Sequence, residues 1–320
     1  MQIESRLTNG AFLVLGRAGL DLYPDPAGTA IEDAVRFIAG LGGSAGNIAA
    51  ALAIGGARVG MIGAVSDDAV GRYTLNELTK RGIGTDHVAV IGGEPRNTLA
   101  LSESRIEGHQ TVIYRNNAAD LSLDETMVAG VDFSSIAALV VTGTTLAADP
   151  ARSAAMAAMQ AAREAKALVV IDLDYRPYGW KSRQEAAEVL TRAATLADIA
   201  IGNDVEFDVM SGGSGTGRDV ARDFARDGRI AIYKMGEHGS VTFQGDSAIE
   251  TPVFAVKALK PVGAGDAFLG TALAALANGA PLATALTRGA ASAAVVVTKP
   301  GCAIALPTPT EIDAFIQDRT

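Results

Sequence analysis

The stretch Val262-Gly263-Ala264-Gly265-Asp266-Ala267-Phe268 decides the fold, because it joins a glycine turn to an apolar helix. Glycine lets backbone N–H groups face a ligand without an intervening Cβ, and such a helix start favours anions. The pattern predicts a helix over 267–278. The helix dipole stabilises negative charge at Asp266, so we expect this carboxylate to be ionised near neutral pH. An ionised carboxylate there can deprotonate an alcohol while the loop holds the phosphoryl group under attack.

Strand-like and helix-like runs alternate along the second half of the chain. Strands are predicted at 138–142, 168–172, 198–202 and 230–235, and helices at 150–166, 185–197 and 219–227. This alternation indicates βαβ units and a mostly parallel sheet. In the first half, we predict strands at 12–15, 59–65, 99–104 and 111–115 and helices at 47–54 and 68–81.

Composition excludes several classes of protein. The chain has 320 residues, of which 48% are hydrophobic, and a net charge of −9, so it can bury a core and lacks the basic face that nucleic acid needs. Cys302 is the single cysteine, so an intrachain disulfide is impossible and the cytoplasm is the simplest location. We expect neither a signal peptide nor a membrane span.

Several polar or glycine positions follow predicted strands, where ligands of open α/β sheets bind. They are Asp21, Arg176, Asn203, Gly236 and Gly263. The glycine-rich segment 42–47 opens a helix, and two interpretations of it stay open. Asn47 is either an N-cap or a ligand of a sugar hydroxyl, with the backbone approaching the sugar closely.

Other candidates also have a purely structural interpretation. Asn203 and Glu206 have the spacing of a capping box, and the segment 236–239 is most simply a turn between two strands. Arg115 and Arg176 each fit a surface position. If they converged on one pocket, however, their guanidinium groups would suit an anionic or keto-acid substrate.

Three common kinds of site lack their motif. No Gly-Lys dipeptide supports a Walker A loop, and the scattered histidines lack a zinc-protease spacing. No Gly-x-Ser-x-Gly elbow is present. The glycines of 212–217 do not follow a clear strand, so we interpret them as a loop and not as a dinucleotide fingerprint.

Together the motifs resemble those of the ribokinase-like (PfkB) carbohydrate kinases. The resemblance rests on Gly-Gly-x-x-x-Asn at 42–47 and Gly-Ala-Gly-Asp at 263–266, and it covers nearly the whole chain. It implies one kinase domain over 1–320, an α/β fold in which a three-layer α/β/α sandwich surrounds a mostly parallel sheet. A small β-sheet lid would be inserted at about 20–40 and 96–115. The implied activity is ATP-dependent phosphorylation of a primary sugar hydroxyl.

The resemblance also implies residue roles. Asp266 would be the catalytic base, and Gly263, Ala264 and Gly265 the anion hole. Sugar would contact Asp21, Gly42, Gly43, Asn47, Arg115 and Arg176. Nucleotide would contact Asn203, Lys234, Gly236 and Gly239, and Glu206 would reach Mg²⁺ through water or phosphate. Relatives also hold a monovalent cation such as K⁺ near the Gly263 loop, and many form homodimers through the lid.

One departure from the family points to a particular branch. The family usually carries Asp-Thr before Gly-Ala-Gly-Asp, whereas this chain has Lys260-Pro261. This pair looks like that of the 5-dehydro-2-deoxygluconokinases of inositol catabolism, as do the stretches 16–23, 114–120 and 172–177. The related 2-keto-3-deoxygluconate kinases hold the acid end of their substrate with arginines matching Arg115 and Arg176.

The implied substrate is 5-dehydro-2-deoxy-D-gluconate, converted to its 6-phosphate. Alternative substrates are 2-keto-3-deoxygluconate, fructose or a sulfonated or phosphorylated ketose. A non-catalytic sugar or nucleotide sensor on the same fold is a further alternative, against which the intact Asp266 argues.

Overall fold

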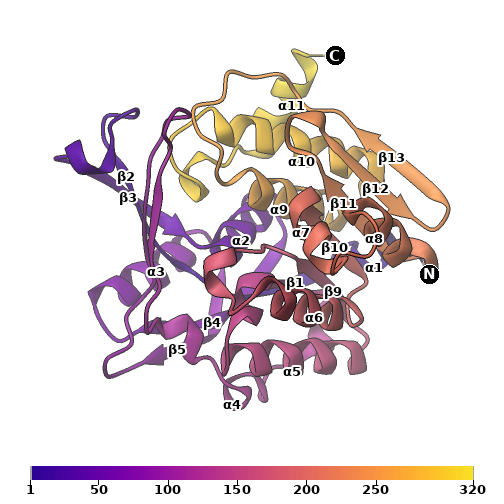
Figure 1. The fold of residues 1–320 in the computed structure, drawn as a ribbon, viewed down its shortest axis with the longest axis horizontal. Coiled ribbons are helices and arrows are strands. Elements are labelled where there is room, and N and C mark those ends of the chain that lie inside the picture. The colour runs from indigo at the N-terminus through magenta and orange to yellow at the C-terminus, as the bar shows by residue number, and fades with distance from the viewer. Residues whose placement is uncertain (1, 320) are drawn as a thin grey trace.

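The chain folds around a large twisted sheet (Figure 1). The computed structural model describes residues 2–319, and within them the sheet has nine strands in the order β13-β12-β11-β10-β9-β8-β1-β4-β5. Their bounds are β1 (Ala11–Leu15), β4 (Arg58–Ser66), β5 (Gly84–Ile91), β8 (Ala138–Thr142), β9 (Leu168–Asp172), β10 (Ile199–Asn203), β11 (Ile230–Lys234), β12 (Ser240–Gln244) and β13 (Ser247–Thr251). The pairs from β5 through β11 are parallel, and β12 and β13 add an antiparallel edge.

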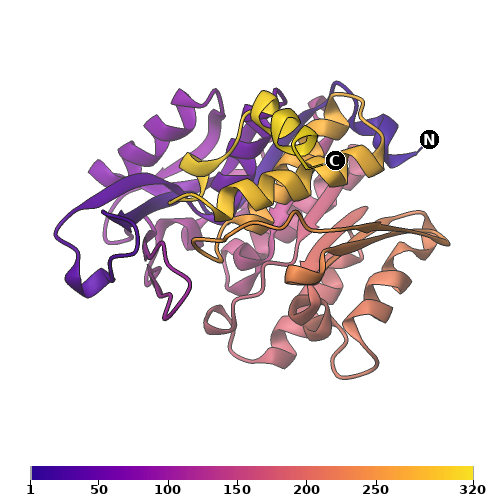
Figure 2. The ribbon, with the colours of Figure 1, turned by 90° about the horizontal axis from the view of Figure 1, so that it is seen from above.

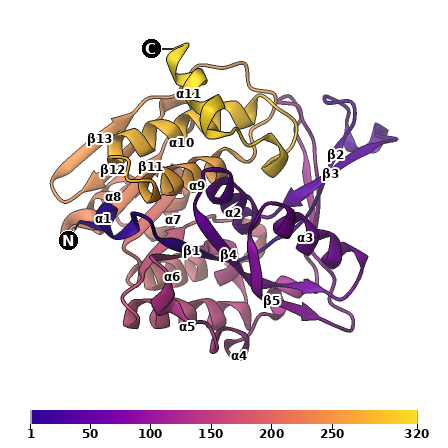
Figure 3. The same ribbon diagram turned by 180° about the vertical axis from the view of Figure 1, so that it is seen from behind.

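Helices cover both faces of this sheet, as the view from behind also shows (Figure 3). One face is covered by α1 (Ile3–Leu7), α2 (Ser44–Ile54), α3 (Ala69–Lys80), α9 (Ala264–Ala277) and α10 (Leu282–Val297), with α11 (Pro309–Gln317) against α10. The other face is covered by α4 (Glu125–Val128), α5 (Ala151–Glu164), α6 (Arg183–Ala194), α7 (Asp204–Met210) and α8 (Gly217–Phe224). The predicted three-layer α/β/α sandwich is therefore confirmed.

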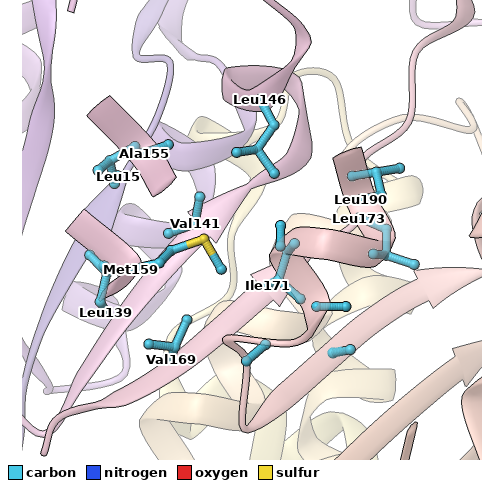
Figure 4. Packing of buried hydrophobic residues seen from close by; sticks show 14 of the residues in the cluster. Leu15, Leu139, Val141, Leu146, Ala155, Met159, Val169, Ile171, Leu173 and Leu190 are labelled. Atoms are coloured by element: carbon cyan, nitrogen blue, oxygen red, sulfur yellow. The ribbon is translucent and has the colours of Figure 1, made fainter. Parts of the chain in front are cut away.

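The central strands are apolar on both sides because both faces are covered. In β8, Leu139 and Val141 belong to the core under α5 and α6, while Ala138 and Val140 belong to the core under α2 and α9. Figure 4 shows the first of these cores, where Met159 of α5 packs on the sheet. This alternation fixes the register of the strands, because a slip by one residue would exchange the two faces.

A second, four-stranded sheet carries the order β3-β2-β6-β7. Its strands are β2 (Gly19–Pro24), β3 (Phe37–Gly42), β6 (Leu99–Ser102) and β7 (Thr111–Tyr114). In Figure 2 the indigo β2–β3 hairpin extends beyond the body of the large sheet. The strands fall largely within the segments 20–40 and 96–115, and the role of this small sheet as a lid stays a prediction.

Most predicted elements are present, with shifted ends. Helix α9 begins at Ala264, three residues before the predicted start, so Asp266 lies inside its first turn. Helix α8 spans Gly217–Phe224 and not 219–227, because a 3₁₀ turn follows it. Several elements were not predicted, among them strands β5 and β13 and helices α10 and α11. The small residues of α10 hid its helical period, and they allow close packing: a Cβ on Gly289 would lie 2.8 Å from the carbonyl oxygen of Phe268.

Among residues 2–319, the structure contains no helix with the length and apolar character needed to cross a membrane.

Candidate active site

A polar cleft of about 760 Å³ lies where the large sheet meets the small one. Strands β9, β10 and β11 end there at Asp172, Asn203 and Lys234. The predicted site residues that line it are Asp21, Gly43, Asn47, Arg176, Asn203, Glu206, Lys234, Gly263, Ala264, Gly265 and Asp266. The rule that ligands bind beyond the carboxyl ends of parallel strands therefore brought together most of the candidates.

An apolar pocket of about 520 Å³ adjoins this cleft. Gly236 and Gly239 line it, and both have positive φ in the short turn between β11 and β12. Its other lining side chains are mostly apolar and include Val253, Phe254, Val256, Phe268, Ala293 and Val297. The apolar pocket shares Lys234, Ala264 and Gly265 with the polar cleft. A flat apolar group and a polar one could therefore occupy the two cavities and meet over these three residues.

The start of α9 separates the two cavities and is built to hold an anion. Gly263 is its N-cap with φ of 86°, a left-handed conformation that glycine adopts most readily. The first intrahelical backbone bond runs from the N–H of Ala267 to the carbonyl of Gly263, so the N–H groups of 264–266 have no acceptor within the helix. A Cβ on Gly265 would lie 3.0 Å from Lys234 Nζ, which places a positive charge beside these donors.

Asp266 lies in this first turn at the base of the cleft. Its Oδ2 accepts a hydrogen bond of 2.8 Å from Asn47 Nδ2, which fixes the orientation of the carboxylate. Burial, aided by the charge of Asp174, raises the pKa of Asp266 to about 6, although Asn47, Arg176 and Lys234 oppose the rise. The helix dipole alone suggested a fully ionised group. With this pKa the carboxylate is ionised above pH 6 and able to accept a proton near neutrality.

Asp21 belongs to β2 of the small sheet and is buried at the wall of the cleft. Its Oδ2 accepts a hydrogen bond of 2.8 Å from Tyr23, whose hydroxyl oxygen accepts one of 3.1 Å from the backbone N–H of Cys302. Burial raises the pKa of Asp21, opposed by the charge of Arg17. Gly42 does not line the cleft. A Cβ on Gly42 would lie 1.9 Å from Asp21 Oδ1, so this glycine makes room for the carboxylate.

Asn203 and Glu206 form the capping box of α7. Asn203 Oδ1 accepts from the Glu206 N–H at 2.9 Å, and Glu206 Oε2 accepts from the Asn203 N–H at 2.7 Å. Both residues also line the cleft, so the structural interpretation holds without removing the functional one. Burial raises the pKa of Glu206, while Lys234 opposes the rise. Residues 2–319 contain no group of three or more His, Cys, Asp or Glu side chains arranged to hold a metal.

The two predicted arginines do come near one another, but only Arg176 lines the cleft. Arg115 and Arg176 both line a much smaller cavity of about 20 Å³, which we call the side pocket, and its walls are Arg17, Ile113, Arg115, Thr144, Ala147, Arg176, Tyr178, Gly179 and Trp180. Arg115 donates to Asp120 Oδ2 at 2.6 and 2.9 Å. Arg176 lies 2.8 Å from Asp174, whose charge raises the pKa of the guanidinium further above its usual range.

Sequence reasoning missed several polar residues of the cleft. Arg17, Asp172 and Asp174 all line it. Asp174 Oδ2 accepts from Ser44 Oγ at 2.6 Å and from Thr144 Oγ1 at 3.1 Å, which ties β9 to the start of α2. The Asp-Leu-Asp triplet after a buried strand was the available signal for both aspartates, since this is the rule that found Arg176. Arg17 directly follows Gly16 after β1 and carried the same signal.

Lys260 is fully buried beneath the glycine loop. Its Nζ donates a hydrogen bond of 2.6 Å to the carbonyl of Val262, the residue before Gly263. Burial lowers the pKa of Lys260, while the charges of Asp266 and Asp21 oppose the decrease. The Lys-Pro departure therefore places an ammonium group directly under the turn that precedes α9.

Comparison with known proteins identifies the family. The model of the pfkB family of carbohydrate kinases matches residues 12–309. The chain is 38% identical to the 5-dehydro-2-deoxygluconokinase of Photobacterium profundum (96% of this chain, 95% of that protein). It is 34% identical to the enzyme of the same name from Geobacillus kaustophilus (96% of this chain, 93% of that protein).

A solved structure agrees with this at the level of the fold. A fructokinase double mutant from Vibrio cholerae O395, with fructose, ADP and potassium ion bound, superimposes with a TM-score of 0.83. It is 24% identical and covers 96% of this chain and 98% of its own. Because the family model spans most of the chain and two relatives match it over nearly full length, the chain belongs to the pfkB family of carbohydrate kinases and is a sugar kinase.

Proposed function

We propose that this sugar kinase phosphorylates the primary hydroxyl of 5-dehydro-2-deoxy-D-gluconate with ATP. The observation that carries the proposal is the position of Asp266, whose carboxylate lies beside unpaired helix N–H groups where the polar cleft meets the apolar pocket. The relatives named for this activity support the substrate assignment. The arginines along the cleft and side pocket are consistent with an acidic sugar.

In the proposed mechanism the sugar occupies the cleft with its primary hydroxyl against Asp266. Asn47 holds Asp266 Oδ2, leaving Oδ1 to accept the hydroxyl proton as the sugar oxygen attacks the γ-phosphorus of ATP. The N–H groups of Ala264, Gly265 and Asp266 stabilise charge on the transferred group, as does Lys234. The anion hole and catalytic base are thus one helical turn.

ATP would place its base in the apolar pocket beside Gly236 and Gly239, with its phosphates reaching toward Lys234. Phe254 and Val256 offer apolar contact there, and the positive φ of both glycines lets the backbone approach closely. Asn203 borders the phosphate end of this path from the cleft.

Mg²⁺ fits this site through Glu206. Mg²⁺ is usually held by one or two carboxylates together with waters and substrate phosphates, so a dedicated cluster of three protein ligands is not needed. Glu206 faces the cleft with an elevated pKa, and a divalent cation would stabilise its ionised form. The bound metal would neutralise phosphate charge. A monovalent cation such as K⁺ near the Gly263 loop stays a prediction, as does the cytoplasmic location.

We also propose a homodimer formed through the small sheet, which would serve as a lid over the sugar. Its two edge strands, β3 and β7, expose large apolar side chains, including Phe37, Ile38, Val112 and Tyr114. Exposed edge strands with apolar residues favour pairing with another chain. A mass measured by light scattering during gel filtration would test the dimer, and a monomer at micromolar concentration would refute it.

The proposed activity is tested by coupled ADP release with Mg·ATP and a panel of acceptors. The panel contains 5-dehydro-2-deoxy-D-gluconate, 2-keto-3-deoxygluconate, fructose, ribose, adenosine and a sulfonated ketose. We expect the first compound to give the highest kcat/KM. Higher kcat/KM with another member would refute the substrate assignment while keeping the kinase. If folded protein binds ATP but releases no ADP with any of these acceptors, the result would favour a non-catalytic sensor.

A further inference from the structure

Two residues that line the side pocket, Arg17 and Trp180, carry buried hydrogen-bond donors without an acceptor among residues 2–319. We propose that it is the subsite for the carboxylate of the substrate, and that Arg17 and Trp180 are the residues that select an acidic sugar. This inference rests on the proposed sugar kinase reaction and adds the residues that bind the carboxylate of its substrate. In this proposal Arg17 and Trp180 take the role of binding the acid end, which the family resemblance had implied for Arg115.

Arg17 differs from the other two arginines of the side pocket in forming no ion pair with an acidic side chain of residues 2–319; its charge reaches Asp21 only beyond ion-pair distance. Arg115 donates two hydrogen bonds to Asp120 Oδ2, and Arg176 is paired with Asp174. The Arg17 side chain has no hydrogen bond or ion pair within residues 2–319, and its Nη1 is buried without a partner. A buried donor of this kind costs free energy unless a ligand or water satisfies it. An anion arriving in the cleft finds one free guanidinium and two that are already neutralised.

Trp180 supplies a second, independent donor. Its side chain is buried, with 7% of the residue exposed, and its indole Nε1 lacks an acceptor among the residues that the structure describes. Buried indole N–H groups normally have a hydrogen-bond partner. The ring is held from outside by Arg152, whose guanidinium carbon lies 5.8 Å from the ring centroid. The carbonyls of Leu146 and Ala147 fix Arg152 in turn, so the indole is pre-positioned.

The size of the side pocket limits what it can admit. Its volume of about 20 Å³ accommodates roughly one water-sized group. Four residues line both the side pocket and the cleft, so the two are continuous: Arg17, Ile113, Arg176 and Tyr178. One oxygen of a planar carboxylate fits inside while the second stays at the mouth near Arg176. A tetrahedral sulfonate or phosphate would have to place two or more further oxygens at this mouth, where a carboxylate places one, and a neutral hydroxyl would leave the charge of Arg17 uncompensated.

The test compares binding of 5-dehydro-2-deoxy-D-gluconate and its uncharged C1 amide by calorimetry without ATP. The variants are Arg17→Met, Arg17→Lys and Trp180→Phe, with Arg226→Met on the exposed surface of the molecule as the control. We expect Arg17→Met to raise the Kd of the acid about 10- to 100-fold, as for a lost hydrogen bond to a charged group. Trp180→Phe keeps the ring but removes the donor, and should raise this Kd about tenfold. Neither change should weaken binding of the amide comparably.

Equal weakening of acid and amide, or unchanged binding of both, would overturn the carboxylate subsite. Arg17→Lys keeps the charge and removes the guanidinium fork, so an intermediate Kd supports the inference even if Arg17→Met fails to fold. ADP release decides the proposed function separately. Wild-type protein that binds the acid through Arg17 yet phosphorylates a different sugar would refute the proposed substrate and retain the subsite. If the protein phosphorylates the acid but Arg17→Met leaves its KM for the acid unchanged, the proposed substrate is retained and the subsite is refuted.

Discussion

Replacing Asp266 by asparagine should separate catalysis from stability, because the structure predicts opposite effects on the two. Asparagine preserves the shape of the side chain but cannot accept the hydroxyl proton. Loss of a general base lowers kcat by about 10²- to 10⁴-fold. Asn47 still has a side-chain oxygen to bond through Nδ2, so the local geometry should be retained.

The effect on stability follows from the elevated pKa. Burial raises the pKa of Asp266 from its ordinary 3.8 to about 6, a change worth about 3 kcal/mol at about 1.4 kcal/mol per pH unit. The folded state thus binds this proton more tightly than the unfolded state does. Its contribution to stability is full below pH 3.8 and is lost as pH rises through 6. At pH 8 the charge is therefore unfavourable, and Asp266→Asn should raise the free energy of unfolding by up to about 3 kcal/mol.

The two effects are measured by ADP release and by urea unfolding at pH 8, with the exposed Asp223→Asn as a control that should change neither. The wild-type kcat/KM should also fall below pH 6 as Asp266 is protonated, whereas the residual rate of Asp266→Asn should lack this limb. Near wild-type turnover of Asp266→Asn would refute the assignment of the base. A loss of stability at pH 8 would refute burial as the cause of the raised pKa.

Three further substitutions test the surroundings of the glycine loop. Lys234→Met removes the ammonium shared by the cleft and the apolar pocket. We expect the KM for ATP, measured by ADP release, to rise by about tenfold or more. The Kd of the sugar, measured by calorimetry, should change less. Gly263→Ala forces a side chain into a left-handed turn with its Cβ 2.8 Å from Cys302 Sγ, and should lower the free energy of unfolding by about 1–2 kcal/mol. Gly28 also has positive φ but has open space around it, so Gly28→Ala should lower the free energy of unfolding only by the cost of the backbone conformation. Equal losses of stability for the two variants would exclude a steric contribution at Gly263. Lys260→Met removes a buried ammonium whose charged form is disfavoured, so the unfolding temperature should stay unchanged. The kcat should fall about tenfold, because the hydrogen bond under the loop is lost. A large decrease in the unfolding temperature would contradict this account of Lys260.

Local patterns predicted the parts of this molecule that local physics controls. The buried runs at β8 and β9 were found because a sheet covered on both faces leaves its strands apolar on both sides. The rule for strand ends located Arg176 and Asn203 in one cleft. These inferences needed only the neighbours of each residue in the chain.

Pairings between distant segments were not predictable in this way. Arg115 ends a strand like a site residue, yet Asp120 occupies its guanidinium, and nothing in the spacing shows that contact. That Arg17 Nη1 has no hydrogen-bond partner among residues 2–319 is visible only once the side chains around it are known. The pKa of Asp266 likewise depends on Asp174 and on burial, neither of which the glycine motif contains.

The hydrogen-bonded chain from Asp21 through Tyr23 to Cys302 constrains how this enzyme can change. Tyr23 is fully buried and bridges a strand of the small sheet to the segment that packs against Gly263. A sugar hydroxyl that bonds Asp21 would share with Tyr23 a carboxylate whose Oδ2 Tyr23 already holds, so replacing Asp21 would remove the partner of both. Substitutions that alter sugar preference at this position would therefore also disturb the loop that handles phosphate. Evolution or engineering toward new substrates should proceed more freely at the far end of the sugar, beside Arg17, than at Asp21.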